Sequence, residues 1–146
     1  MVRSLLRFLL PLFLGIVPAS CGPTCSEIDI STAPPASEAD FIVTFPENAF
    51  GIFLFLGSVP ENPERPVIWS IRQEAARALP NPLRISYGVV PKGMVQEEKA
   101  LPLKEGVLVR VTAQYSTGSY WNPVCHSARL YRRVGGRFVE APEGRE

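Results

Sequence analysis

Proline and glycine are the residues that most constrain the fold of this chain. Its 146 residues include fifteen prolines and eleven glycines, which are spread along the sequence and not gathered in one segment. Proline breaks the interior of a helix, and both residues are typical of turns. Long helices are therefore not expected, and the segments between turns should be short strands.

Apolar and polar residues alternate in most of these segments, which is typical of half-buried strands. Trp69 is expected to anchor the core, and Gly135-Gly136 predicts a tight hairpin turn. Residues 73–79 have the composition of a short helical turn, and 88–94 predict a turn or an edge segment. We therefore expect an all-β fold, a two-sheet antiparallel sandwich of seven or eight strands. The expected strands cover residues 27–31, 41–45, 49–57, 67–71, 83–87, 107–115, 125–134 and 137–139.

The segment from Ile52 to Leu56 is apolar at every position, whereas a strand of a two-layer sandwich normally has one polar face. Two interpretations are open. The strand is central and a loop covers its outer face, or this face meets a partner, another copy of the chain, or a lipid surface.

Residues 1–20 have the three parts of a secretory signal peptide. Arg3 and Arg7 make the basic part, 8–17 form an apolar core, and 18–20 are small. Ten helical residues reach only about 15 Å, half of a ~30 Å hydrocarbon core. A cleaved signal is therefore expected, not a membrane-spanning helix.

The end of this segment, Ala19-Ser20-Cys21, resembles a bacterial lipoprotein signal, although Pro18 stands where that family usually has an aliphatic residue. The resemblance implies that Cys21 is lipidated and becomes the new N-terminus. Ordinary secretion with cleavage near Ala19 or Ser20 is the alternative. On the lipoprotein interpretation, 21–26 are a lipid-anchored tether, 27–140 the sandwich domain and 141–146 a flexible tail.

Cysteine usage agrees with export. The three cysteines are Cys21, Cys25 and Cys125, and an odd number in an exported protein leaves one thiol to explain. If Cys21 carries lipid, Cys25 and Cys125 can form a disulfide in an oxidising compartment. The alternative is that both are buried free thiols.

Residues 66–115 resemble fibronectin type III and related immunoglobulin-like sandwiches, in which a leucine and a Pro/Gly turn precede an alternating strand. Leu108 stands where such domains usually carry the tyrosine of the tyrosine corner. The chain is also similar to small uncharacterised bacterial lipoproteins, which implies a fold and no activity. The residues of that similarity are Trp69, Ile71, Ile85, Tyr87, Gly88, Leu103 and Gly106.

Three aromatic residues, Tyr115, Tyr120 and Trp121, are interleaved with Ser, Thr and Gly and form the candidate binding surface. Rigid amphipathic rings beside small hydrogen-bonding residues are typical of recognition loops, and aromatic rings also stack on sugars. The alternative is that Tyr120 and Trp121 fold back over a Cys25–Cys125 bridge as a minor core.

The sequence contains few residues that could form a catalytic or metal-binding site. His126 is the single histidine, and Cys125 with His126 supplies only two metal ligands. Glu97 and Glu98 are expected to be solvated charges on a loop. We find no hydrolase elbow and no phosphate-binding loop, and the charge is close to balanced at +1. We expect no enzyme, no cofactor, no metal and no nucleic-acid partner.

These observations together predict an exported lipoprotein anchored to the cell membrane or the outer membrane. It is expected to be a non-enzymatic interaction or accessory protein of the cell envelope, with membrane lipid and an envelope or membrane protein as partners. The alternative is a cell-surface module that binds a small ligand or a glycan. Without lipidation the chain is expected to be secreted or periplasmic.

Overall fold

The structure is a computed structural model that describes residues 25–75, 77–117 and 124–142. These residues form nine strands and no helix. The strands are β1 (Asp29–Thr32), β2 (Phe41–Thr44), β3 (Phe50–Val59), β4 (Trp69–Gln73), β5 (Leu83–Ile85), β6 (Met94–Glu98), β7 (Leu108–Ser116), β8 (Cys125–Val134) and β9 (Arg137–Glu140).

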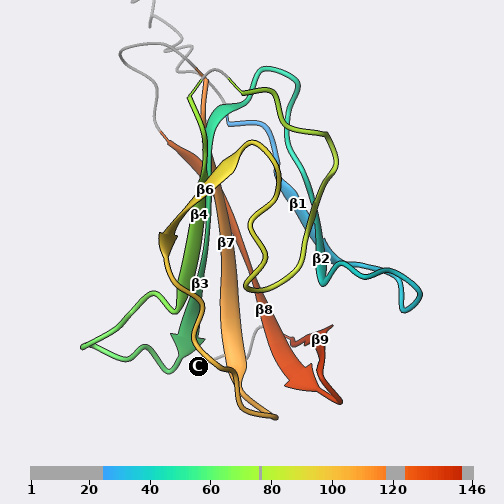
Figure 1. Ribbon diagram of the computed structural model, residues 1–146, viewed down its shortest axis with the longest axis vertical. Helices are drawn as coiled ribbons and strands as arrows, with labels where there is room; N and C mark the ends of the chain where they lie inside the picture. The colour runs from blue at the N-terminus through green and yellow to red at the C-terminus, as the bar shows by residue number, and fades with distance from the viewer. Residues whose placement is uncertain (1–24, 76, 118–123, 143–146) are drawn as a thin grey trace, which may run out of the picture.

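The strands form two antiparallel sheets that pack face to face. The small sheet has the order β1-β2-β5, and the large sheet has the order β6-β4-β3-β7-β8-β9. In Figure 1 the blue strands β1 and β2 lie beside the large sheet, whose strands β3, β7 and β8 run nearly the full height of the molecule. The predicted all-β sandwich is therefore confirmed, with nine strands where seven or eight were expected.

Strand order makes the fold compatible with an immunoglobulin-like sandwich. The neighbours β3-β7-β8 correspond to the C-F-G sheet of that architecture, and β1-β2 to the start of its second sheet. Three further strands extend the large sheet, β4 and β6 beyond β3 and β9 beyond β8. The sequence predicted β9 as the return of the Gly135-Gly136 hairpin, and both glycines have the positive φ that such a tight turn needs.

Alternation decides which side chains of the large sheet enter the core. In β3 the side chains of Ile52, Leu54 and Leu56 are buried, whereas Phe53 and Phe55 point to the outer face and are half-buried. In β4 and β7 the same two-residue period buries one face. The buried residues of those two strands on this face are Trp69, Ile71, Val109, Val111, Ala113 and Tyr115.

Tyr131 of β8 connects the two sheets. Its side chain is 0% exposed, and its hydroxyl donates a 3.0 Å hydrogen bond to the carbonyl oxygen of Ile30 in β1. Its ring makes an edge contact with Phe41 of β2, with the centroids 5.0 Å apart. Phe41 also contacts Phe138 of β9, at 4.7 Å. One side chain therefore joins the large sheet to both strands of the β1–β2 hairpin.

Two segments differ from the expectation. No helix forms in the described part of 73–79, because Gln73 ends β4 and uses its side chain to bond the Ile52 N–H and the Arg77 carbonyl oxygen. Glu97 and Glu98 lie in the edge strand β6 and not on a loop. Glu97 forms an ion pair with Arg72 of the neighbouring strand.

Burial of Tyr131 predicts a specific sensitivity to alkali. Loss of hydration, with a smaller contribution from the nearby Glu140 carboxylate, raises the pKa of Tyr131 from 10.0 to about 12. The neutral phenol is therefore favoured in the folded state. The stability that it contributes is complete below pH 10 and is lost as the pH rises from 10 through 12, by roughly 2–3 kcal/mol.

We expect Tyr131→Phe to be about 1 kcal/mol less stable than the parent at pH 8, because it lacks one hydrogen bond. Near pH 12 the variant should be the more stable of the two, since it has no phenol to ionise. Urea unfolding at both pH values measures this. Burial also raises the pKa of Tyr87, which both proteins contain. If both proteins lost the same unfolding free energy between pH 8 and pH 12, the loss would not come from Tyr131 and the prediction would be wrong.

Candidate binding surfaces

A disulfide fastens the first described residue to the large sheet. Cys25 and Cys125 are bonded, with sulfurs 2.03 Å apart and Cα atoms 5.5 Å apart. Cys125 begins β8, so the bond joins the start of the domain to a strand near its C-terminal end, 100 residues later. The predicted pairing is confirmed, and the free-thiol alternative is wrong.

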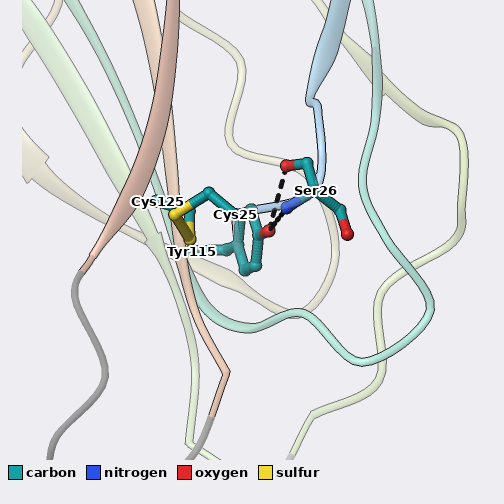
Figure 2. The surroundings of a disulfide bond; sticks show 4 residues. All are labelled: Cys25, Ser26, Tyr115 and Cys125. Atoms are coloured by element: carbon teal, nitrogen blue, oxygen red, sulfur yellow. Dashed lines mark hydrogen bonds between the residues drawn. A yellow bond between two sulfur atoms is a disulfide. The ribbon is translucent and has the colours of Figure 1, made fainter. Parts of the chain in front are cut away.

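Tyr115 lies beside the Cys25–Cys125 disulfide (Figure 2). It lies opposite Cys125 in the register of β7 and β8. Its hydroxyl accepts a hydrogen bond from the Ser26 N–H and donates one to the Ser26 carbonyl oxygen, both 3.0 Å long. The side chain is only 1% exposed, so Tyr115 is a core residue and is not part of a binding surface. Tyr120 and Trp121, the other two predicted residues of that surface, lie outside the described residues.

The outer face of the large sheet carries a second candidate, the aromatic pair Phe53 and Phe55. The ring centroids are 5.4 Å apart. Phe55 lies between Ser70 of β4 and Thr112 of β7 in the register, and both of these polar residues are buried. The strand is central in its sheet, as one interpretation predicted, but its outer-face phenylalanines keep part of their surface in solvent.

A groove at one end of this outer face is the third candidate. The register aligns Val59, Leu108, Arg132 and Val139 in one row across β3, β7, β8 and β9. The adjacent row contains Arg110 and Leu130, and the Ala141 N–H extends it with a 2.8 Å hydrogen bond to the Leu130 carbonyl oxygen. The groove between these side chains has a volume of about 600 Å³.

Arginines near the β8–β9 hairpin are divided between different environments. The Arg133 guanidinium lies over the Phe138 ring, 5.4 Å from its centroid. Arg137 donates to the Pro35 carbonyl oxygen at 2.6 Å, and Arg132 donates to the Gly106 carbonyl oxygen at 3.0 Å. These three arginines therefore contact three different segments, namely strand β9, the loop at Pro35 and the loop at Gly106.

The described residues contain no group of three or more histidine, cysteine, aspartate or glutamate side chains that could hold a metal ion. His126 is exposed on the outer face, opposite Gln114. Within the same residues, no helix is long and apolar enough to cross a membrane.

Comparison with known proteins identified no relative of this chain. No family model matches the chain, and no curated protein or solved structure is significantly similar to it. The sandwich architecture therefore follows from the strand order and packing of this chain alone.

We expect removal of the disulfide by Cys25→Ala with Cys125→Ala to cost several kcal/mol. In the chain-entropy model a bond that closes a loop of about 100 residues stabilises the fold by ~4.7 kcal/mol, less any strain. Urea unfolding followed by tryptophan fluorescence measures the loss. Cys21→Ala is the matched control and should leave the unfolding midpoint unchanged. Equal midpoints for oxidised and reduced protein would contradict the prediction.

Proposed function

We propose that this chain is an exported protein, lipid-anchored at Cys21, that acts as a non-enzymatic interaction protein of the cell envelope. The proposal combines a lipoprotein-like signal with an outer sheet face that presents aromatic side chains. The sequence supplies the first part, and the fold supplies a surface for the second.

Cysteine pairing is the observation that carries the anchor. The chain has three cysteines, and Cys25 is bonded to Cys125. Cys21 is therefore the cysteine left outside this bond, and it stands at the position where the signal resembles a lipidation site. A disulfide that spans the domain also suits an oxidising compartment. Lipidation would account for the leftover thiol, which ordinary secretion would not.

The anchor would hold the domain close to the bilayer. Three residues lie between Cys21 and Cys25, and the four residue steps from one cysteine to the other span at most ~14 Å when extended. The disulfide lies at the end of the large sheet where β7 ends and β8 begins, which is the upper end in Figure 1. The β8–β9 hairpin lies at the opposite end, about 23 Å further along β8 from Cys125 to Arg132.

Phe53 and Phe55 are the residues that we assign to partner contact. Both lie on the outer face of the large sheet. If the strands of the anchored domain run along the membrane normal, this face points sideways and is open to a neighbouring envelope protein. Aromatic side chains that lose their remaining exposed surface on binding are the usual centres of protein interfaces.

Mass spectrometry of the tagged chain, extracted in mild detergent from its own membranes, tests the anchor. We expect a chain that begins at Cys21 and carries acyl mass, and we expect Cys21→Ser to release the protein from the membrane fraction. An unmodified soluble chain that starts near residue 20 or 21 would contradict the lipoprotein assignment.

Site-specific photo-crosslinking in intact cells tests the partner surface. A crosslinker at Phe55 should capture one envelope protein, and one at the exposed Val89 on a loop should not. The double substitution Phe53→Thr with Phe55→Thr keeps the strand propensity. With the crosslinker placed at another residue of the outer face, this variant should capture the partner at least tenfold less than the parent does. Equal capture from Phe55 and Val89 would argue against this face.

A further inference from the structure

The groove of the outer face combines aliphatic walls with an excess of arginine. Val59, Leu108, Leu130 and Val139 line it, together with Arg110, Arg132 and the Ala141–Pro142 segment. None of these side chains belongs to the core face of the sheet, because they alternate with the buried residues of the same strands. Arg129 and Glu140, which the register assigns to the other face of β8 and β9, also line the groove. The walls are therefore available to something other than the second sheet.

The guanidinium groups of Arg110 and Arg132 have no anionic partner among the described residues. Arg110 pairs with Leu130 in the register, and Arg132 is two residues further along the same strand, so the two arginines are diagonal neighbours. The ion pairs within the described residues are Arg72–Glu97 and Arg77–Glu74, and neither involves the groove. Arg132 has only the Gly106 carbonyl oxygen, and Arg110 has no hydrogen bond to a described residue.

One carboxylate lies at the rim of the groove, but it belongs to the other face of the strand. Glu140 is opposite Tyr131 in the register, so its side chain alternates away from Val139 and toward the edge of the core. Its carboxylate contributes to the raised pKa of Tyr131 and forms no ion pair with an arginine of the groove. The groove therefore keeps an excess of positive charge.

We propose that this groove binds a single amphipathic anion, a carboxylate, sulfate or phosphate head with an alkyl chain. Guanidinium groups bind such heads through paired hydrogen bonds, and the aliphatic row accepts the chain. A volume of about 600 Å³ is within the range of small-molecule sites. The lining contains no aromatic ring on which a sugar could stack, so the groove does not suit a glycan. This inference is independent of lipidation at Cys21.

Nuclear magnetic resonance titration of the full exported chain, with its disulfide intact, tests the site. The probes are decanoate, acetate and 1-octanol, which supply head and chain, head alone and chain alone. Decanoate should shift the amide signals of Leu108, Arg110, Leu130, Arg132 and Val139. Acetate and 1-octanol should bind at least tenfold more weakly. Shifts centred outside the groove, or no binding of decanoate, would overturn the proposal.

Two substitutions separate the contributions of charge and chain. Arg110→Gln, alone or with Arg132→Gln, should weaken decanoate binding tenfold or more and leave 1-octanol unaffected. Arg84→Gln, which removes an exposed arginine from β5 of the small sheet, is the matched control and should have no effect. Val139→Ser changes a half-exposed side chain and should reduce the dependence of affinity on chain length. An equal loss in Arg84→Gln would contradict a defined site.

Other occupants give distinct results. Residues 143–146 follow Pro142 directly and include Glu143 and Glu146. If decanoate bound only after removal of these residues, the chain itself would fill the groove and the proposal would be wrong. If the groove signals responded to phosphatidylglycerol vesicles but not to dispersed decanoate, the groove would contact a membrane surface, and the assignment to a single molecule would likewise fail.

Discussion

The hydrogen bond and ring contacts of Tyr131 are the interactions on which the two-layer structure depends. The small sheet has three short strands, and β1 and β2 contain four residues each, too few to be stable by themselves. Tyr131 places a fully buried ring against Phe41 and a hydroxyl on the Ile30 carbonyl oxygen. The hairpin is thereby held by the large sheet, and the large sheet gains the cover for its core face. The outer face, where we place both proposed binding sites, is left to solvent by the same arrangement.

Much of this architecture can be predicted from the period of the sequence. Residues such as Trp69 and Ile71, two positions apart, indicated a strand with one buried face, and both are buried. Counting the cysteines predicted the Cys25–Cys125 bond, because the lipoprotein-like signal set Cys21 aside as the expected lipidation site and left two cysteines to pair. The strand β6 was missed because Pro91 and Gly93 precede it and its last three residues are polar, so it has little alternation to detect. Its polarity is the property of an edge strand that faces solvent.

Tyr115 shows where local composition misleads. Its neighbours Ser116 and Thr117 are typical of a loop, and this placed the ring on a predicted recognition surface. The two-residue period of Val109, Val111 and Ala113, continued by one step, reaches Tyr115 and predicts burial. The groove has no such signal in the sequence. It depends on the register of four strands, and no pattern within one strand shows that Arg110 and Arg132 become neighbours.

The Cys25–Cys125 bond also determines how the domain would carry a mechanical load. A pull on the chain before Cys25 enters β8 through a covalent bond, and β8 has a hydrogen-bonded strand on each side, β7 and β9. The force then runs along these ladders in shear, which many hydrogen bonds resist together. Without the bond the same pull would reach β1 first, and the four residue pairs that join β1 to β2 would carry it in place of the eight that join β7 to β8 and the four that join β8 to β9. A domain held by its N-terminus at a moving surface would therefore keep its small sheet closed under tension.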